Sequence, residues 1–385
     1  MTGLTAAEQY LARARATRAY TARHLAYYGG APDAATAPWI SYRRSTAEPD
    51  YSDSWYDCSQ VLADAALAAC GDAACADYAA KAFRHLERHW DAAGGYFGRG
   101  GIRGDWVAGP DKYTDDNALA GVALLHAYTS APNAALRERY LARAVAIAAY
   151  LVGDLWDDVF GGGFWWNTHR GDGVEGKPAQ SNGLAALLFL RLHNLTGDPR
   201  WHAWAARTLA WLDATLWDAA AGLYRYSVHY ADLAARTGRI VEGRHFNYDQ
   251  AILIEALALR AGAQGAAASL ARARTIASLL NDAFWDETLG GYVLESGVPQ
   301  LFLVYAAWLT PTLLALHAAD GDARWLSLAR RNADTLHARL YDPADGGYAH
   351  RAWREAGQVR LAPERHTAAQ AWMQYAQAAL ASALR

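Results

Sequence analysis

Two aspartates stand side by side at the start of an apolar segment, YTDDNALAGVALLHAY, at residues 113–128. Adjacent like charges cost free energy unless a neighbour, a proton or a ligand compensates, so Asp115 and Asp116 require an explanation. At a helix start, one carboxylate can accept backbone N–H bonds and interact with the helix dipole, which stabilises its ionised form. The charge of the first carboxylate then raises the pKa of the second. We therefore expect one base and one acid.

Hydrolysis of a glycosidic bond needs such a pair. Its two carboxyls flank the anomeric carbon, about 5 to 5.5 Å apart for retention of configuration and about 6.5 to 9.5 Å apart for inversion. Inside a helix, adjacent side chains diverge by about 100° and do not face one substrate, whereas at a helix start they can. The simpler alternative is that both aspartates only cap the helix. We take Asp115 and Asp116 as the candidate catalytic residues.

One short element recurs along the chain and marks where helices end. It consists of an aromatic residue followed by Asp, then a short turn, Gly and further aromatic residues. Its copies are HWDAAGGYF (89–97), LWDDVFGGGFWW (155–166), LWDAAAGLYRY (216–226), FWDETLGGYVL (284–294) and LYDPADGGYAH (340–350). Asp and Gly suit a helix end followed by a tight turn, where side-chain capping and left-handed backbone geometry are needed.

Two kinds of helical segment lie between these turns. The first kind is rich in Arg and Ala with one apolar stripe, at residues 137–155, 200–216, 268–284 and 323–340. The second kind is apolar nearly all round and begins with polar residues, at 55–70, 113–128, 179–195, 246–262, 305–320 and 364–380. Six pairs of outer and inner helices predict an all-α fold, an (α/α)6 toroid, with residues 1–385 as a single catalytic domain. The alternative is an open helical array without a site.

In such a toroid, the polar starts of the inner helices converge at one mouth. The loops there are rich in aromatic residues, including Trp106 and the adjacent Trp165 and Trp166 in GGGFWWNTHRGDG. Sugars have flat C–H faces and polar rims, so aromatic rings beside Asp, Asn and Gln suit a carbohydrate. Two adjacent tryptophans flanked by glycine do not easily bury on one side, so we expect at least one stacking platform. The long loops 98–112 and 227–245 are expected to shape the ends of the cleft.

The ordered set Asp-Asp-Asn, Trp-Trp-Asn and Ser-Asn-Gly resembles glycoside hydrolase family 76, the α-1,6-mannanases and their relatives. The segments that carry the resemblance are YTDDNALAGVALLHAY, GGGFWWNTHRGDGVEGKPAQSNGLAALLFLRLHNLTGDPRW and FNYDQAILIEAL. The resemblance implies an (α/α)6 barrel and a retaining enzyme that uses tandem aspartates and neither metal nor cofactor. By position, Asp115 corresponds to the nucleophile that forms a mannosyl-enzyme intermediate, and Asp116 to the acid/base.

The resemblance also implies a set of residues that shape the substrate cleft. At matching positions stand Asn117, Trp165, Trp166, Asn167, Ser181, Asn182, Tyr248 and Gln250. We add four residues near the starts of inner helices: Tyr113, Asp57, Trp308 and Asp249. Asp249 stands where the family commonly has Asn, and Leu119 where it often has Trp. These departures leave the sugar and the linkage open.

Two other activities are compatible with the same toroid. A transglycosylase would pass the sugar from the same two aspartates to another sugar instead of water. A sugar isomerase or epimerase would use paired histidines to move protons beside a carbonyl. The sixth inner helix offers His366 with Glu364 and Trp372, but lacks the His-Pro-x-His sequence that such epimerases tend to carry. Removal of Asp115 should abolish glycoside cleavage, whereas His366→Ala should only weaken it.

Composition excludes several classes of partner. The formal net charge of −3 and pI near 6.5 give no basic patch for nucleic acid, so a neutral carbohydrate is the expected partner. No apolar run reaches the roughly 18 to 20 residues that span a bilayer. The N-terminus lacks the apolar core of a signal peptide, so the chain as written is expected to be cytoplasmic, or secreted if a signal was trimmed, and monomeric.

Histidine and cysteine spacing gives no sign of a metal centre. The 13 histidines include no His-Glu-x-x-His, and the three cysteines are not spaced as Cys-x-x-Cys. Cys70 and Cys75 are expected to be buried thiols rather than a disulfide. We therefore expect no metal and no cofactor.

Overall fold

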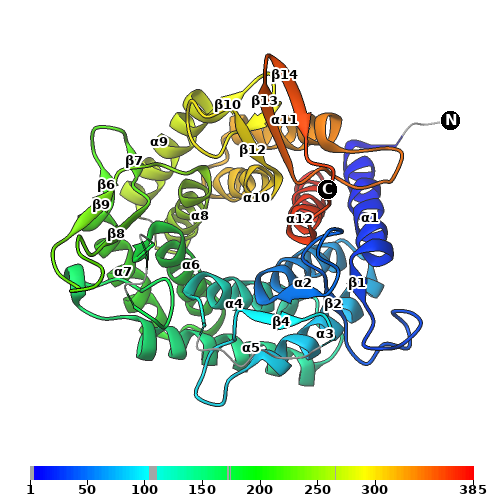
Figure 1. The fold of residues 1–385 in the computed structure, drawn as a ribbon, viewed down its shortest axis with the longest axis horizontal. Helices are drawn as coiled ribbons and strands as arrows, with labels where there is room; N and C mark the ends of the chain where they lie inside the picture. The colour runs from blue at the N-terminus through cyan, green and yellow to red at the C-terminus, as the bar shows by residue number, and fades with distance from the viewer. Residues whose placement is uncertain (1–3, 104–110, 171–172, 174, 265) are drawn as a thin grey trace.

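The computed structural model describes residues 4–103, 111–170, 173, 175–264 and 266–385. Within these residues, twelve α-helices form two concentric rings (Figure 1). The inner ring contains α2 (Ser54–Ala69), α4 (Thr114–Thr129), α6 (Ala179–Thr196), α8 (Asn247–Gln264), α10 (Leu303–Asp320) and α12 (Thr367–Ala383). The outer ring contains α1 (Ala6–His24), α3 (Ala73–Leu86), α5 (Ala134–Tyr150), α7 (Pro199–Thr215), α9 (Ala267–Phe284) and α11 (Ala323–Leu340). This arrangement confirms the predicted (α/α)6 toroid.

The ring closes between the two ends of the chain. Each inner helix contacts the next one, and α12 contacts α2. Each outer helix packs against the inner helix that precedes it, and α1 packs against α12 (Figure 1). The links that follow α6 and α10 are short because Gly197 and Gly321 end these inner helices in left-handed geometry. Asp198 and Asp322 then cap the next outer helices through their side chains.

Each recurring aromatic-Asp element forms a small antiparallel hairpin between an outer helix and the next inner helix. β6 (Trp217–Asp218) pairs with β7 (Leu223–Tyr224), and β10 (Trp285–Asp286) pairs with β11 (Gly291–Tyr292). Single bridges join the aromatic residues of the other three copies, Trp90 with Tyr96, Trp156 with Phe164, and Tyr341 with Tyr348. Glycine is required at Gly95, where φ is 81° and a Cβ atom would lie 2.5 Å from the ring of Tyr150.

The remaining strands lie in the loops that lead into the inner helices. β1 (Ala26–Tyr27) pairs with β2 (Ser41–Tyr42), and β3 (Tyr51–Asp53) pairs with β4 (Arg99–Gly101). β8 (Ser227–His229) joins β5 (Lys177–Pro178) to β9 (Ile240–Glu242), and β13 (Arg351–Glu355) joins β12 (Gln300–Phe302) to β14 (Gln358–Leu361). All of these pairs are antiparallel. Because β3, β5 and β12 end where α2, α6 and α10 begin, the small sheets fix the N-terminal ends of these helices.

Three short helical segments lie near the ends of outer helices. They are the 3₁₀ segments η1 (Glu87–His89) and η3 (Val159–Gly161), and the π-helical segment η2 (Leu151–Leu155). The sequence predicted an outer helix as far as residue 155, and η2 accounts for its last residues, where the helix widens after Tyr150.

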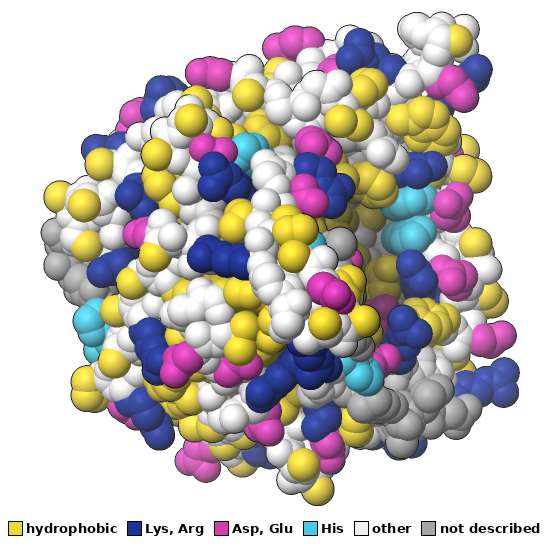
Figure 2. Space-filling view, turned by 60° about the vertical axis from the view of Figure 1, so that its left-hand side comes forward, with side chains coloured by type: hydrophobic (Ala, Val, Ile, Leu, Met, Phe, Trp, Pro, Cys, Tyr) yellow, Lys and Arg dark blue, Asp and Glu magenta, His cyan; other side chains and the backbone are white. Residues whose placement is uncertain are grey.

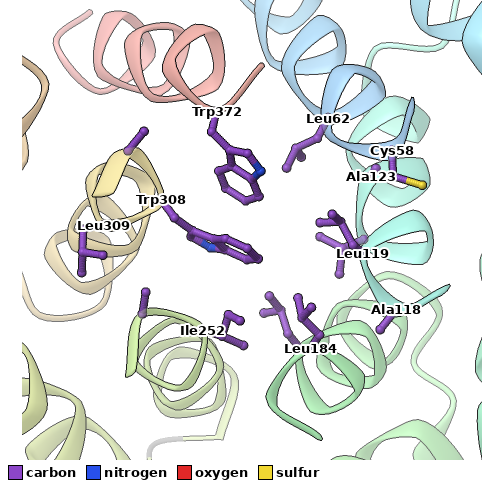
Figure 3. Packing of buried hydrophobic residues seen from close by; sticks show 14 of the residues in the cluster. Cys58, Leu62, Ala118, Leu119, Ala123, Leu184, Ile252, Trp308, Leu309 and Trp372 are labelled. Atoms are coloured by element: carbon purple, nitrogen blue, oxygen red, sulfur yellow. The ribbon is translucent and has the colours of Figure 1, made fainter. Parts of the chain in front are cut away.

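Side chains fill the centre of the inner ring (Figure 3). The rings of Trp308 and Trp372 stack with centroids 3.9 Å apart, and both residues are buried. Leu119, Leu184 and Ile252, from three other inner helices, point toward the same centre (Figure 3). The toroid is therefore a packed core below its mouth, as close packing of protein interiors requires.

The cysteines belong to this interior. Cys58, Cys70 and Cys75 are buried free thiols, which confirms the expectation that Cys70 and Cys75 are not bridged. Burial raises the pKa of both Cys70 and Cys75, so their thiols stay protonated at neutral pH. Across the part of the chain that the structure describes, no helix has the length and apolar character needed to cross a membrane.

Candidate active site

Asp115 and Asp116 lie in the first turn of α4, as predicted. Two donors hold the buried carboxylate of Asp115: the indole Nε1 of Trp166 donates to Oδ2 at 3.1 Å, and the backbone N–H of Asp116 donates to Oδ1 at 3.1 Å. Thr114 anchors the helix start, because its hydroxyl donates to the carbonyl oxygen of Trp165 at 2.6 Å. The position of α4 is therefore tied to the loop that carries the two tryptophans.

Asp116 is held by a neighbouring inner helix. The hydroxyl of Ser54, the first residue of α2, donates to Asp116 Oδ2 at 2.9 Å. Asp53, the residue before it, caps α2 by accepting the backbone N–H of Tyr56 at 3.0 Å. Chain packing here is close: a Cβ atom at Gly98 would lie 3.2 Å from Asp116 Oδ2. Two inner helices thus bring a third carboxyl, that of Asp53, to the tandem pair.

The two carboxyls of the pair differ in their proton affinity. Burial raises the pKa of Asp115 to about 6, while the bonds from Trp166 and from the backbone N–H of Asp116 work against this rise. Burial and the charges of Asp115 and Asp53 raise the pKa of Asp116 well above its ordinary value. Burial likewise raises the pKa of Asp53 to about 8. Near neutral pH, the site therefore holds one carboxylate, Asp115, beside a protonated Asp116.

The aspartates line a cleft at the mouth of the toroid. A cavity of 340 Å³ is lined by Asp53, Trp55, Tyr56, Asp115, Asp116, Trp166, Glu175, Pro178, Gln180, Tyr226, Tyr248 and Tyr305. An adjoining cavity of 250 Å³ shares the three aspartates and adds Arg44, Tyr51, Gly98, Arg99 and Tyr113. Figure 2 shows this side of the molecule hollowed, with hydrophobic, basic and histidine side chains around the hollow.

The cleft continues away from the tandem pair into a third cavity of 400 Å³. It shares Arg44, Trp55, Tyr56, Tyr248 and Tyr305 with the first two cavities, so the three form one continuous surface. Its other lining residues are Phe246, Leu294, Phe302, Val304, His350, His366, Ala368 and Ala369.

A larger cavity of 600 Å³ lies at the opposite ends of the inner helices. Its charged groups, Arg191 and Glu255, form an ion pair with each other, and the rest of its lining is mainly alanine with no aromatic ring. Because it offers neither stacking surfaces nor free carboxyls, we assign the site to the mouth despite the smaller volume there.

The two adjacent tryptophans point to different places. Trp166 is half-buried and lines the cleft beside Asp115, with its ring 4.9 Å from the ring of Tyr113. Trp165 is buried, donates from Nε1 to Asp157 Oδ2 at 2.6 Å, and stacks on Tyr230. Of the expected stacking platforms, only Trp166 therefore reaches the cleft. Trp106 lies outside the described residues.

Several residues expected to bind substrate instead hold the hairpins in place. Asn117 accepts the backbone N–H of Tyr96 at 2.7 Å and donates to the carbonyl oxygen of the same residue at 3.1 Å. The same pair of bonds joins Asn182 to Phe164, Gln250 to Tyr224 and Gln370 to Tyr348. Each of these amides is the fourth residue of its inner helix. These amides hold the hairpins that surround the mouth, but their side chains are buried and do not line the cleft.

Five other expected residues also lie behind the cleft surface. Asp57 is buried and bonds to His85 Nδ1 at 2.7 Å and to the backbone N–H of Tyr42 at 2.9 Å. Asn167 accepts the backbone N–H of His169 at 3.0 Å. Ser181 and Asp249 are fully buried, and Trp308 lies in the core described above. Tyr113, Trp166 and Tyr248 therefore remain as the expected binding residues on the cleft.

The structure adds cleft residues that sequence reasoning missed. They are Asp53, Ser54, Trp55 and Tyr56 at the start of α2, Gln180 at the start of α6, and Tyr226 and Tyr305. The signal was present for the α2 group, since YSDSWYD contains a capping Asp directly before a predicted inner helix. Tyr226 is the last residue of the recurring turn at 216–226, and Tyr305 is the first residue of the predicted inner helix at 305–320.

Comparisons with known proteins agree with this architecture. The family model for glycosyl hydrolase family 76 matches residues 104–304. A GH76 α-mannanase structure from Bacteroides thetaiotaomicron is similar with 17% identity, a TM-score of 0.77, and coverage of 97% of this chain and 95% of that chain. The α-1,6-mannanase of Salegentibacter sp. HEL1_6 is similar with 20% identity, a TM-score of 0.76, and coverage of 97% and 99%.

A third structure shows that the same toroid serves other chemistry. A sugar epimerase from a ruminal bacterium has 13% identity, a TM-score of 0.66, and coverage of 85% of this chain and 87% of that chain. A search of curated proteins found no match.

The family match spans over half of the chain and contains Asp115, Asp116, Trp166 and Tyr248. The structural matches agree with it in fold, and the site geometry supplies the two carboxyls that glycoside hydrolysis needs. This chain therefore belongs to glycosyl hydrolase family 76 and is a glycoside hydrolase.

Proposed function

We propose that this enzyme hydrolyses α-mannosides with retention of configuration, and that its substrate is α-1,6-linked mannan or manno-oligosaccharides. The observation that carries the proposal is the tandem pair, in which two adjacent carboxyls of different proton affinity line one aromatic cleft. A similar structure supports it: an inactive variant of the Salegentibacter α-1,6-mannanase, with two adjacent Asp-to-Asn substitutions, is in complex with α-1,6-mannotriose. That structure has 20% identity to this chain and a TM-score of 0.74.

In the first step, Asp115 acts as the nucleophile. Its carboxylate attacks the anomeric carbon while the bond from that carbon to the glycosidic oxygen breaks. Asp116 gives its proton to the departing oxygen, so the leaving sugar departs as a neutral alcohol. The products are a mannosyl ester of Asp115 and an ionised Asp116. The raised pKa of Asp116 supports the acid role, and the two hydrogen bonds to Asp115 support the role of nucleophile.

In the second step, Asp116 acts as the base. It removes a proton from water, the water oxygen attacks the anomeric carbon, and the ester bond to Asp115 breaks. This restores an ionised Asp115 and a protonated Asp116. Trp166 keeps its indole N–H on Asp115 Oδ2, so the leaving carboxylate has a donor in place.

The aromatic residues of the cleft suit the sugar faces. Trp166, Tyr248 and Tyr305 surround the pair, and Gln180 and Glu175 offer polar groups for the sugar hydroxyls. We also propose that residues 1–385 act as one catalytic domain and as a monomer, and that Asn117, Asn182 and Gln250 serve by holding the hairpins.

Transfer to another sugar is the second candidate for the same pair. It differs only in the acceptor that attacks the ester, so the same two aspartates serve. Isomerisation is favoured less, because the family match is to a glycosyl hydrolase family and the sixth inner helix lacks the His-Pro-x-His sequence that such epimerases tend to carry.

The test is hydrolysis of α-1,6-mannan and of a panel of α-mannosides, with product lengths read by chromatography and anomeric configuration read by NMR. The wild-type chain is compared with Asp115→Asn, Asp116→Asn and His366→Ala. The control is Asp158→Asn, which alters the other Asp-Asp pair of the chain at an exposed position.

We expect cleavage with retention that both active-site variants lose and that Asp158→Asn keeps. Longer products that appear when acceptor sugars are added would show transfer. Cleavage that survives Asp115→Asn, or that disappears only in His366→Ala, would overturn the assignment of the tandem pair.

A further inference from the structure

A cluster of three potential metal ligands lies on the wall of the third cavity, away from the tandem pair. His350, Glu364 and His366 each offer one ligand atom, and these atoms lie within 4.8 Å of one another. His350 and His366 line the 400 Å³ cavity, which is continuous with the catalytic cleft. None of the three has a role in the proposed hydrolysis.

Backbone pairing builds this cluster from distant parts of the chain. His350 directly precedes β13, and Glu364 and His366 follow β14, so the hairpin of β13 and β14 brings them together. His366 also pairs with Ser45 through a backbone bridge. The neighbouring backbone bonds, from Thr367 N–H to the carbonyl of Arg44 and from Thr46 N–H to the carbonyl of Arg365, fix the same junction. The three side chains therefore start from a rigid platform.

Hydrogen bonding determines which nitrogen of His350 is free. Nδ1 lies 3.1 Å from the carbonyl oxygen of Glu364, which only accepts, so Nδ1 carries a proton. In the neutral ring, Nε2 then carries the lone pair. This is the arrangement found in metal-binding histidines, where one ring nitrogen donates to a carbonyl or carboxylate and the other binds the ion.

The lone pair of His350 faces a second acceptor. Nε2 lies 3.8 Å from Glu364 Oε1, and two acceptors at this separation repel unless a proton or a cation lies between them. The rings of His350 and His366 stack with centroids 3.9 Å apart and planes 23° apart. Two charged imidazolium rings would repel at that distance, so at least one ring is neutral and able to bind a metal.

We propose that His350, Glu364 and His366 bind one divalent transition-metal ion of the Zn²⁺ or Ni²⁺ class. Two imidazoles and a carboxylate are the donor set that such ions prefer over Mg²⁺ or Ca²⁺. Ligand atoms bonded to one Zn²⁺ lie roughly 3 to 4 Å apart, which matches the 3.8 Å between His350 and Glu364. Rotation of the His366 ring out of the stack completes the set. The remaining coordination positions face the cavity.

The charges around the cluster permit a cation. Arg44 lines the same cavity, but its guanidinium pairs with Glu48 at 3.2 Å. Arg365 pairs with Asp342 and Asp345, both at 3.0 Å. Arg44 and Arg365 are therefore balanced by carboxylates other than Glu364, whereas Arg351, whose charge also acts on His350, lies over the rings of Phe302 and Trp353.

A second cluster, Asp57 with His85 and His89, is the structural contrast. All three residues are fully buried, and His85 Nδ1 lies 2.7 Å from Asp57 Oδ2, which is the distance of a direct hydrogen bond. A proton already joins these two groups, and neither lines a described cavity. The experiment must nevertheless distinguish the two clusters.

The test is a calorimetric titration of ZnSO₄ into the full chain, produced without a histidine tag and treated with chelator. Co²⁺ titration with visible absorption reports the number of ligands independently. The variants are His350→Ala, His366→Ala and Glu364→Gln, the last of which keeps the size of the side chain. The matched control is His202→Ala, which alters a histidine whose ring lies 5.3 Å from that of His193; among the described residues, these two belong to no group of three potential metal ligands.

We expect one Zn²⁺ per wild-type chain, at least a tenfold loss of affinity in each of the three variants, and no change in His202→Ala. Circular dichroism spectra identical to wild type would show that the variants are folded. Absence of saturable binding, or binding unchanged in all three variants, would overturn the proposal. The latter result would point to the cluster of Asp57, His85 and His89. Neither result depends on hydrolysis.

Discussion

The chain contains two Asp-Asp pairs, and the structure compensates their charges in different ways. Asp157 and Asp158 lie in the hairpin between α5 and α6 and are neutralised by cations. Asp157 Oδ1 lies 2.6 Å from the buried Lys177 Nζ, and Asp158 lies 3.1 Å from Arg207. Although partial burial opposes it, hydrogen bonds from Lys177 and Trp165 lower the pKa of Asp157 below its ordinary value. Asp157 is therefore ionised, and its role is structural.

The pair at the mouth has no such partner. Among the described residues, no lysine or arginine forms an ion pair with Asp115 or Asp116, and the bonds that hold them come from an indole, a hydroxyl and a backbone N–H. Burial therefore raises the pKa of both carboxyls, to about 6 for Asp115. The same dipeptide is thus a stabilising element where cations meet it and a reactive one where they are withheld.

The adjacent tryptophans connect the two pairs. Trp165 donates its indole N–H to Asp157, and Trp166 donates its indole N–H to Asp115. The structural pair therefore positions the loop that supports the catalytic pair, and this division can be tested by substitution.

The largest expected effect is on catalysis, from Asp115→Asn and Asp116→Asn. Loss of the nucleophile or of the acid should lower kcat/KM on α-1,6-mannan by about 10⁴-fold, equivalent to about 5.4 kcal/mol. Urea denaturation should show no loss of stability, because Asp115→Asn removes a buried charge and Asp116→Asn replaces a protonated carboxyl with a neutral amide of similar size. Asp158→Asn should keep wild-type activity. Equal activity in Asp115→Asn and wild type would remove the distinction between the two pairs.

For the structural pair, Asp157 and Asp158, we expect the opposite pattern, in which the substitution affects stability. Asp157→Asn leaves the ammonium of Lys177 buried without a carboxylate, which should cost about 3 kcal/mol of unfolding free energy. Burial already lowers the pKa of Lys177 to about 8, and loss of Asp157 should lower it further. The unfolded chain then binds the proton more tightly, so the deficit should be larger at pH 7 than above pH 10.

A second variant makes this test independent of poor expression. Lys177→Met combined with Asp157→Asn removes both charges while keeping an acceptor for the indole of Trp165. It should recover part of the lost stability, measured by urea denaturation at both pH values. A double variant less stable than Asp157→Asn alone would argue against an unpaired charge as the cause.

The comparison also explains what the sequence could predict. Asp-Asp before an apolar run predicted the position of the catalytic pair, and the recurring Trp-Asp turns with two kinds of helix predicted the toroid. These features depend on local periodicity and turn chemistry. The partners of the aspartates do not follow from such local features: Ser54 and Asp116 are 62 residues apart, and only the packing of consecutive inner helices brings α2 beside α4.

The same limit accounts for the residues expected on the cleft but found behind it. Asn117, Asn182 and Gln250 each occupy the fourth position of an inner helix, as does Gln370, which the sequence did not single out. These four amides bond to the backbone of the preceding hairpin because of the direction in which the fourth residue of each inner helix points. The residue pattern of the sequence does not specify that direction. Trp308 is similar, because its stacking partner Trp372 lies on the next inner helix.

A smaller effect, about tenfold, is expected from Ser54→Ala. The hydroxyl of Ser54 donates to Asp116 Oδ2, which leaves Oδ1 to carry the acid proton toward the glycosidic oxygen. Without it, kcat on mannan should fall about tenfold, whereas an aryl α-mannoside with a good leaving group, which needs little acid assistance, should be cleaved at nearly the wild-type rate in the first step. Ser54→Thr should restore the rate on mannan. Equal losses on both substrates would make Ser54 merely structural.

The last expected effect is on stability alone and concerns Asp249, a buried carboxyl that neither pair explains. Its two oxygens have no side-chain partner among the described residues, and burial raises its pKa well above the ordinary value. The folded chain therefore keeps a proton that the unfolded chain loses above pH 4, so wild-type stability falls as pH rises through this range. Asp249→Asn has no proton to lose, so its stability relative to wild type should rise with pH, by about 1.4 kcal/mol for each unit of pKa shift that is removed. Urea denaturation from pH 4 to pH 8 measures this directly, and a difference that does not change with pH would mean that Asp249 is ionised in the folded enzyme, as Asp157 is.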